Sequence, residues 1–352
     1  MPSPRDDESE LIFKIVTLFF EGKMASEIQA TLSREYPRLT REAVYPKLAK
    51  ARALGLVRLV PPVEPLLAAQ IKERFPTCRA TDIHVVMTQA PQYNEAVSAV
   101  AADIALDLLR KLATTVDPEL GVGLGLGPGK ATLDFARSLS AHLDDATGIP
   151  RLALFAITAG CIATRPEYAP VSFFNLFPDS RITKRVGLFA ETLVPVKDFP
   201  RIQKQPGVRE AFAARDEIRL VVTALGDSSD EHDLLATFLK DFGRDIASTN
   251  AIGNVQYRPF TKTGPVREKP NDLRAVTLFE LDDLVSMSRE KDRYVILIAR
   301  QCGICGMHRA NVLRPLLERN ESRVFSHLVL DLATAEALLS EPRDNPDASA
   351  GG

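Results

Sequence analysis

The chain has 352 residues, of which 45% are hydrophobic and 26% are charged, and its formal net charge is −2. This length predicts two or three domains with a sizeable core, and the near balance of charge excludes a protein that is basic throughout while leaving room for a local basic face. Four cysteines, no signal peptide and no apolar run of about 18 residues predict a reduced protein of the cytoplasm without a membrane span.

The first part of the chain predicts three short helices. Apolar residues recur at helical spacing over 10–22, which ends on Gly22, and over 24–36, where Ser26 is a candidate cap. Thr40 opens a third helix over 40–55, and the strand-like residues 56–60 follow it. This order is typical of a helix-turn-helix unit, plain or winged, and we assign it to residues 1–60.

A local excess of positive charge lies in this unit. Residues 34–58 hold seven basic side chains against two acidic ones, Glu35 and Glu42, an excess of +5. The basic residues are Arg34, Arg38, Arg41, Lys47, Lys50, Arg52 and Arg58. Such a patch suits the phosphate backbone of DNA, although a solvated surface has the same composition. Its position before the proline-rich hinge 61–65 and a large α/β region favours a DNA reader tethered to a sensor.

The rest of the chain predicts an α/β effector domain. Residues 61–75 form a linker with a connecting helix whose apolar stripe offers a surface for a copy of itself; the effector domain spans 76–340, and a polar tail at 341–352 is expected to be disordered. Short apolar strands alternate with helices, which is typical of a Rossmann-like parallel sheet covered on both faces. The expected strands are 82–89, 152–158, 217–226, 294–300 and 326–331. Ligands of such sheets lie beyond the carboxyl ends of the strands.

The stretch 121–139, GVGLGLGPGKATLDFARSL, has a glycine at every second position and then becomes an amphipathic helix. Glycines let an anion approach the backbone, and the helix N-terminus offers free N–H groups to it. A Walker A loop would need Gly at Leu124 and Ser or Thr at Ala131, and no window fits G-x-G-x-x-G. The loop therefore predicts an anion but not a nucleotide, and close helix–strand packing is the alternative reason for the glycines.

A late loop carries Cys302, Cys305 and His308 within seven residues. The pattern C-x-x-C is typical of redox and zinc sites. A structural zinc site needs four ligands, however, and no second Cys/His pair is visible because Cys78 and Cys161 stand alone. We therefore favour two small apolar residues in a tight reduced loop, and we expect neither a metal nor a cofactor.

From about Leu11 to Ser340 the chain resembles the SorC family of sorbitol-operon regulators. The resemblance is carried by EIQATL at 27–32, TREAVYPKLAKARALGLVRL at 40–59, LGLGPGKATLDFARSL at 124–139, the segment 190–229, AIGNVQYRPFTKTGPV at 251–266 and LDLATAEALLS at 330–340. It implies an N-terminal helix-turn-helix and a sugar-phosphate-sensing domain with the fold of ribose-5-phosphate isomerase and glucosamine-6-phosphate deaminase.

The resemblance also implies functional residues. It places Thr40, Arg41, Tyr45 and Lys47 near the DNA groove and Lys50 at a phosphate. With the loops at the strand ends, it assigns to the effector Gly125, Gly127, Gly129, Lys130, Ala131, Thr132, Ala159, Gly160, Gly226, Asp227, Asn254, His308 and Arg309.

The chain departs from the family pattern at several of these positions. Residues 33–38 are inserted between the second and third helices, and Pro46 stands where an arginine is common. Lys130 and Ala131 replace an Arg-Thr pair, Asn254 replaces an acidic residue, and the usual lysine of the late loop is replaced near His308 and Arg309. These departures leave open an effector that differs from the family norm.

Two classes of function follow. The first is a transcriptional regulator, a homodimer or homotetramer that binds operator DNA and whose DNA affinity a small phosphorylated sugar or related metabolite controls. The alternative is an isomerase- or deaminase-like enzyme with the same sensor fold, which needs a general base such as Asp227 or Glu231. Capping or solvated roles also account for those two carboxylates, and a basic helical module has no purpose in such an enzyme. We therefore expect a regulator that is not an enzyme.

Overall fold

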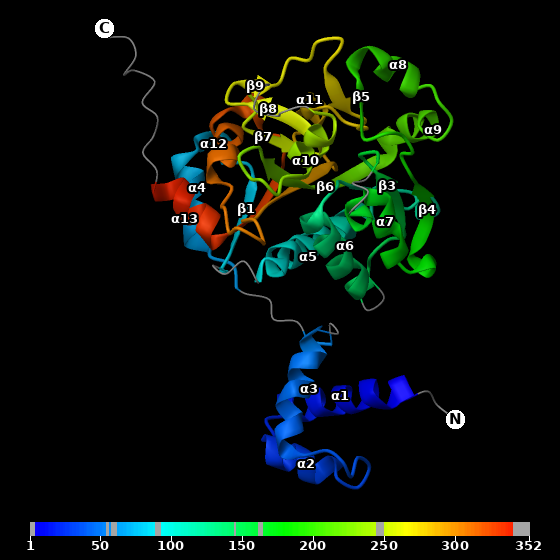
Figure 1. The fold of residues 1–352 in the computed structure, drawn as a ribbon, viewed down its shortest axis with the longest axis vertical. Coiled ribbons are helices and arrows are strands. Elements are labelled where there is room, and N and C mark those ends of the chain that lie inside the picture. Colours follow the sequence, from blue (N-terminus) through cyan, green and yellow to red (C-terminus); the bar gives the residue numbers. More distant parts are fainter. Residues whose placement is uncertain are drawn as a thin grey trace. The chain divides into compact units, whose positions relative to one another are not determined.

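The computed structural model describes residues 4–53, 56–57, 62–88, 93–143, 146–160, 165–243 and 250–340. The chain forms two compact units, Met1–Val60 and Pro61–Gly352 (Figure 1). The expected tail at 341–352, most of the strand-like segment 56–60 and Cys161 lie outside the described residues. Within the described part of the chain, no helix is both long enough and apolar enough to cross a membrane.

The first unit consists of α1 (Pro4–Phe20), α2 (Ala25–Leu32) and α3 (Arg41–Ala53), as the sequence predicts. Gly22, with φ +85°, ends α1, and its N–H donates to Phe19 O at 3.0 Å. The predicted cap Ser26 is wrong, because α2 begins at Ala25 and the Glu27 carboxylate accepts from the Met24 N–H at 2.7 Å. The buried side chains of this unit form two small clusters, one of Leu11, Ile15, Ala25, Ile28, Leu32, Leu39 and Val44 and one of Ile12, Val16 and Ala51.

The second unit is built on a parallel sheet with strand order β1-β12-β11-β6-β2-β3-β4. The strands are β1 (Asp82–Val86), β2 (Val122–Leu126), β3 (Leu152–Ala156), β4 (Ile182–Val186), β6 (Ile218–Asp227), β11 (Tyr294–Ala299) and β12 (His327–Asp331). All residues of β2, β3 and β12 are buried, which explains their nearly continuous apolar sequences. The predicted strands and their parallel arrangement are confirmed.

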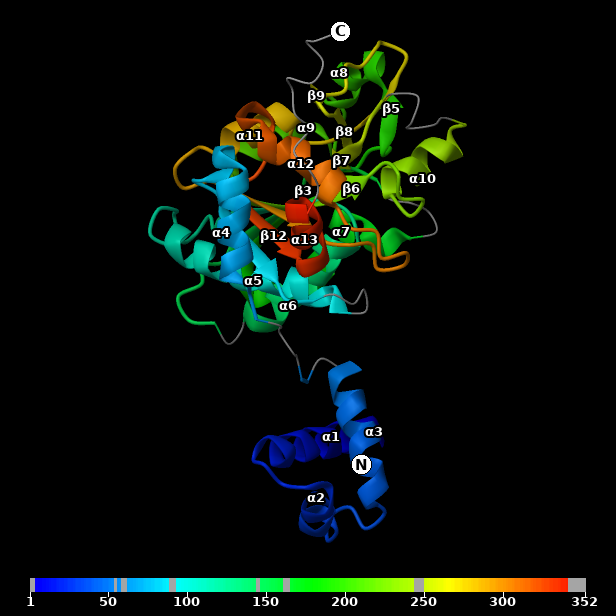
Figure 2. The ribbon, with the colours of Figure 1, turned by 90° about the vertical axis from the view of Figure 1, so that its left-hand side faces the viewer.

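Helices cover the sheet on both sides (Figures 1 and 2). Helices α5 (Glu95–Leu112) and α6 (Lys130–Leu143) pack against each other on one side, and α12 (Ala310–Glu318) and α13 (Leu332–Ser340) lie on the other. Further short helices are α7 (Pro170–Phe173), α8 (Phe199–Ile202), α9 (Arg209–Ala213), α10 (Leu234–Asp241) and α11 (Leu281–Met287).

Antiparallel strands extend the sheet beyond the predicted elements. Strand β6 is ten residues long, and its last residues pair with β7 (Gly253–Val255), which continues into β8 (Arg258–Thr261) and β9 (Gly264–Pro265). A separate ladder joins β5 (Leu193–Pro195) to β10 (Leu273–Ala275). The β7–β9 meander rises at the carboxyl end of β6, so it adds a wall at the edge where a ligand is expected.

Helix α4 (Pro65–Arg74) belongs to the second unit. Its Ala68 and Ile71 are buried in the core of the same chain, where α4 packs against α13 and β1. The apolar stripe that the sequence offers for self-association is therefore largely used within the chain, although Leu66 remains 71% exposed. Self-association stays a prediction.

Candidate functional site

A cavity of about 510 Å³ lies at the carboxyl ends of β2, β6 and β11. From β2 the chain continues to β3 and β4 on one side of the sheet, whereas from β6 it continues to β11 and β12 on the other side. The direction in which successive strands are added therefore reverses between the neighbouring strands β2 and β6. This reversal is where ligands bind in open α/β sheets, and the volume is in the range of small-molecule sites.

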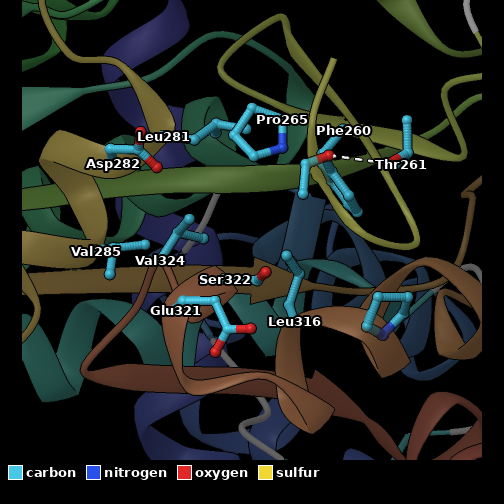
Figure 3. A pocket seen from close by; sticks show the side chains of 12 residues that line it. Phe260, Thr261, Pro265, Leu281, Asp282, Val285, Leu316, Glu321, Ser322 and Val324 are labelled. Carbon is cyan, nitrogen blue, oxygen red and sulfur yellow. Dashed lines mark hydrogen bonds between the residues drawn. The ribbon is translucent and has the colours of Figure 1, made fainter. Parts of the chain in front are cut away.

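A second pocket lies between the β8–β9 turn, α11 and the end of α12 (Figure 3). Phe260, Pro265, Leu281 and Val285 are among its lining residues, and its volume is about 10 Å³. Such a space holds about one water molecule. The large cavity is therefore the candidate site for a metabolite.

The β2–α6 loop forms one wall of the cavity, through Pro128, Gly129, Lys130 and Ala131. The N–H of Leu133 donates to Gly129 O at 3.0 Å, so the N–H groups of the three residues between them precede this first helical hydrogen bond. Gly129 has φ +104°, a conformation that favours glycine, and an added Cβ would reach only Leu234, at 3.6 Å. The backbone at Gly129 is thus open to the cavity.

The preceding glycines have a different surrounding. A Cβ on Gly125 would lie 2.8 Å from Ile157 Cγ2, and one on Gly127 would overlap the Thr223 side chain. Neither residue lines the cavity. These two glycines therefore allow β2 to pack closely against β6 and the residue after β3, whereas the sequence left open close packing of a helix against a strand.

Two basic side chains meet one buried carboxylate beside this loop. Lys130 Nζ lies 2.9 Å and Arg300 Nη2 lies 2.8 Å from Asp134 Oδ2. Arg300 also donates to the carbonyl of Asn94 at 2.8 Å. Arg137 Nη1 lies 3.7 Å from Asp134 Oδ1, and Glu95 Oε1 lies 3.9 Å from Lys130 Nζ. Three positive charges against two negative charges leave a net positive charge next to the α6 N-terminus, which favours an anion there.

A polar group forms the β6–β7 side of the cavity. Asn254 Nδ2 donates to Asp233 Oδ2 at 3.0 Å, and Asp233 Oδ1 accepts from the Ala236 N–H, which caps α10. Burial raises the pKa of Asp233 to about 6. Gly226 is required here, because a Cβ would overlap the Asn254 and Asp233 side chains. Asn254, which stands where the family pattern has an acidic residue, therefore serves as a hydrogen-bond donor inside the protein.

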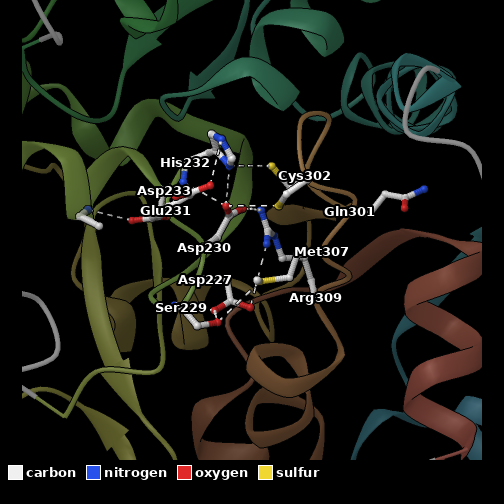
Figure 4. Close-up of polar contacts among 12 residues, drawn as sticks. Asp227, Ser229, Asp230, Glu231, His232, Asp233, Gln301, Cys302, Met307 and Arg309 are labelled. Atoms are coloured by element: carbon white, nitrogen blue, oxygen red, sulfur yellow. Dashed lines mark hydrogen bonds and ion pairs between the residues drawn. The ribbon is translucent and has the colours of Figure 1, made fainter.

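A third group of polar side chains connects the loop after β6 to the loop after β11 (Figure 4). Arg309 Nη2 donates to Asp230 Oδ2 at 2.7 Å. Burial raises the pKa of Asp230, but the Arg309 hydrogen bond and the His232 backbone N–H outweigh it and hold that pKa at about 2. His232 Nδ1 lies 3.1 Å from Asp230 Oδ1 and 3.8 Å from Cys302 Sγ.

The predicted effector residues divide into two sets. Those that line the cavity are Gly129, Lys130, Ala131, Gly226, Asn254 and Arg309. Those that do not are Gly125, Gly127, Thr132, Ala159, Gly160, Asp227 and His308. Asp227 instead accepts from the Ser229 N–H and hydroxyl at 2.9 and 2.6 Å, and His308 Nδ1 accepts from the Ala310 N–H at 3.3 Å.

Several residues that line the cavity are not among the predicted effector residues, including Arg165, Tyr168, His232, Asp233, Gln256 and Arg300. Arg300 has a signal in the sequence, since it is the first charged residue after an apolar strand whose carboxyl end faces the expected ligand. Gln256 has none, because it lies in the turn between β7 and β8, which the sequence does not predict.

The candidate DNA-binding residues lie on α3 and at its start. The Thr40 hydroxyl accepts from the Ala43 N–H at 3.3 Å and so caps the helix. Arg41 and Tyr45, four residues apart, share one face and are exposed, Tyr45 by 60%. They form the part of the candidate set that is open to solvent at the helix N-terminus.

Lys47 and Lys50 lie on another face of α3. Both pair with Glu8 of α1, Lys50 at 2.7 Å and Lys47 at 3.5 Å. The hydrogen bond from Lys50 lowers the pKa of Glu8. Part of the positive charge that the sequence assigns to DNA is therefore paired within the unit.

No family model and no curated protein matches the chain. Solved structures do match it. The full-length sorbitol operon regulator SorC from Klebsiella pneumoniae is 17% identical, with 94% of this chain and 98% of that chain covered and a TM-score of 0.55. The chain shares its fold.

Two further structures give the same result for the larger unit. A DeoR family transcriptional regulator from Listeria monocytogenes is 14% identical, with 77% of this chain and 97% of that chain covered and a TM-score of 0.55. The proposed sugar-binding domain of a transcriptional repressor from Vibrio fischeri is also 14% identical, with coverages of 77% and 98% and a TM-score of 0.52. These likenesses confirm the predicted fold, a helix-turn-helix unit followed by a mostly parallel α/β domain.

Proposed function

We propose that this chain is a SorC-type transcriptional regulator whose larger unit senses a small phosphorylated sugar or a related metabolite. The observation that carries the proposal is the cavity at the strand-order reversal, with the open N-terminus of α6 and the Lys130–Asp134–Arg300 group in its wall. The fold shared with proteins described as a sorbitol operon regulator and a sugar-binding domain supports it.

The cavity has separate places for an anion and for hydroxyl groups. The Gly129 N–H donates to Tyr168 O, so the backbone N–H groups of Lys130 and Ala131, with the positive side chains of Lys130 and Arg300, are the groups that suit a phosphate. Across the cavity, Asn254, Gln256 and Asp233 offer amide and carboxylate groups for sugar hydroxyls. This division favours a ligand with a phosphate at one end and hydroxyls along its length.

The first unit is the proposed DNA reader. Arg41 and Tyr45 present an exposed face of α3 to the groove, while Lys47 and Lys50 exchange Glu8 for DNA phosphates. We further infer a homodimer or homotetramer in the cytoplasm, because helix-turn-helix readers bind paired half-sites on operator DNA.

The enzyme alternative has less support from the candidate bases. Asp227 does not line the cavity, and its carboxylate accepts two hydrogen bonds from Ser229. Glu231 has a side chain that is 79% exposed. Neither carboxylate is placed to take a proton from a ligand in the cavity.

The decisive experiment selects duplexes from a random pool with the full-length chain and then titrates the selected duplex at several salt concentrations. Sugar phosphates and the matching unphosphorylated sugars are added in parallel. We expect salt-sensitive binding, and a shift in DNA affinity of about 5- to 150-fold with a phosphorylated ligand only. Absence of any preferred duplex, or conversion of a sugar phosphate to product, would contradict the proposal.

A further inference from the structure

Four side chains with metal-binding atoms meet at the edge of the large cavity. Asp230 and His232 follow β6, and Cys302 and Cys305 follow β11, so the parallel neighbours β6 and β11 bring the two loops together (Figure 4). One donor atom of each residue lies within 4.8 Å of the donor atoms of all the others. His308, the ligand that the sequence suggests, is not part of this cluster.

Three of the six separations between donor atoms are near those of a tetrahedral site, and the others are within 4.8 Å. Zn²⁺ ligand bonds of about 2.0–2.3 Å place the donors of a tetrahedron roughly 3.3–3.8 Å apart. His232 Nδ1 lies 3.1 Å from Asp230 Oδ1 and 3.8 Å from Cys302 Sγ, and Cys305 Sγ lies 3.6 Å from Asp230 Oδ1. The donors are therefore close to coordination distance from one common point.

A tight turn holds the two cysteines in one short loop. The Gly306 N–H donates to Cys302 O at 2.9 Å, and Gly306 has φ +73°, which closes the turn immediately after Cys305. The turn keeps both sulfur atoms at the edge of the cavity where Asp230 and His232 lie.

Arg309 completes the surroundings of the cluster. It bonds Asp230 Oδ2, so Oδ1 of the same carboxylate faces the histidine and Cys305. Outer hydrogen bonds of this kind orient ligating carboxylates. Two thiolates and one carboxylate carry three negative charges, which a divalent ion and the Arg309 guanidinium balance.

We propose that Asp230, His232, Cys302 and Cys305 bind one Zn²⁺ ion. Two sulfur atoms and one imidazole nitrogen select zinc over Mg²⁺ or Ca²⁺, which prefer oxygen ligands. The histidine and carboxylate directed at the thiols distinguish this site from a simple dithiol pair. Because Gly303 and Ile304 line the cavity, the ion fixes that part of its wall to the loop after β6.

The test uses the full-length chain, reduced and freed of metal with a chelator, and Co²⁺ as the probe. We expect a thiolate-to-cobalt charge-transfer band and the strong visible bands of tetrahedral cobalt, both saturating at one ion per chain and removed by Zn²⁺. Cys302→Ser and Cys305→Ser should each abolish the charge transfer from one sulfur and weaken binding by more than the ~10- to 100-fold cost of losing an outer partner. His232→Gln and Asp230→Asn should weaken binding while retaining thiolate charge transfer.

Cys78→Ala is the matched control, because Cys78 is a buried cysteine outside the cluster and its loss should leave the cobalt spectrum unchanged. Thermal unfolding checks that each variant folds, and Zn²⁺ should raise the melting temperature of the wild type and of Cys78→Ala but not of Cys302→Ser. The proposal is overturned if the reduced wild type gives no thiolate–cobalt band, or if folded Cys302→Ser and Cys305→Ser bind Co²⁺ as tightly as wild type. The titration needs neither DNA nor a sugar phosphate, so its outcome is independent of the proposed regulatory function.

Discussion

The two ends of the large cavity differ in their chemistry. At the β2–α6 loop, backbone N–H groups and a net positive pair of side chains suit a hard anion. At the cluster of Asp230, His232, Cys302 and Cys305, negative and sulfur-containing side chains suit a soft cation. Anion binding at the first end thus depends on backbone conformation, whereas cation binding at the second end depends on side chains. Different substitutions should therefore weaken binding at each end.

Each end also contains a buried arginine that pairs with a buried aspartate. Arg300 lies 2.8 Å from Asp134, and Arg309 lies 2.7 Å from Asp230. The pairs differ because Lys130 also neutralises Asp134, whereas the second cation near Asp230 would be the proposed metal ion.

The largest effect is expected from Arg309→Met in the metal-free chain. It leaves the Asp230 carboxylate buried without its cation, which should lower the free energy of unfolding of the larger unit by about 3–5 kcal/mol. Arg300→Met should cost less, because Lys130 remains 2.9 Å from Asp134. Urea unfolding of both variants measures the difference, and equal losses would remove the distinction between the two ends.

Gly129→Val should act through the backbone at the anion end. A side chain at φ +104° strains the loop and shifts the N–H groups at the start of α6, so binding of a sugar phosphate should fall by more than about 100-fold. Gly22→Val is the matched control, since Gly22 has φ +85° with open space around it but lies in the other unit. If calorimetry shows the same loss of binding in both variants, general destabilisation explains the result and not the loop.

Lys130→Ala should remove charge and leave the loop intact. A charge-assisted hydrogen bond contributes about 1.5–3 kcal/mol, so a phosphorylated ligand should bind roughly 10- to 100-fold more weakly. Cobalt binding at the other end should be unchanged. Calorimetric titration decides this, and wild-type affinity for every phosphorylated ligand would count against an anion site at this loop.

The smallest effect at neutral pH is expected from His327→Gln, which lies in β12 outside both ends of the cavity. Burial lowers the pKa of His327 to about 4, although Asp82 at 3.3 Å opposes this. The unfolded chain therefore binds a proton near pH 6.5 that the folded chain binds only near pH 4, so His327 reduces stability as the pH falls through this window and has no effect on it above.

Melting temperatures of wild type and His327→Gln between pH 4 and 8 measure this contribution. The other groups near His327 are His84 and Lys111, which also disfavour its charge, and the ring of Tyr294. We expect the variant to lose less stability than wild type on acidification. Parallel curves for the two proteins would show that His327 is not the titrating group. The difference between the two melting curves isolates the contribution of His327, which lies outside the cavity.

Elements with local signals were predictable from the sequence. Helical periodicity located α1, α2 and α3, alternating glycines located β2, and apolar runs located β6 and β11 with the sheet edge where the cavity lies. The open glycine loop was also readable, because Gly129 and the α6 N-terminus are adjacent in the chain, although the N–H of Gly129 itself donates to Tyr168 O. The sequence could not tell Gly129 from Gly125 and Gly127, because the neighbours of these two glycines come from other strands.

Which distant side chains meet depends on the tertiary fold. The antiparallel β7–β9 extension depends on β6 continuing past its parallel neighbours, and no periodicity within 253–265 records that. The sequence offers only His308 as a further ligand beside the two cysteines, whereas the fold places His232 and Asp230, 70 residues or more away along the chain, within 4 Å of them. Such contacts are set by strand order and by the direction in which two loops leave neighbouring parallel strands, and these are properties of the assembled sheet that no short segment of the chain contains.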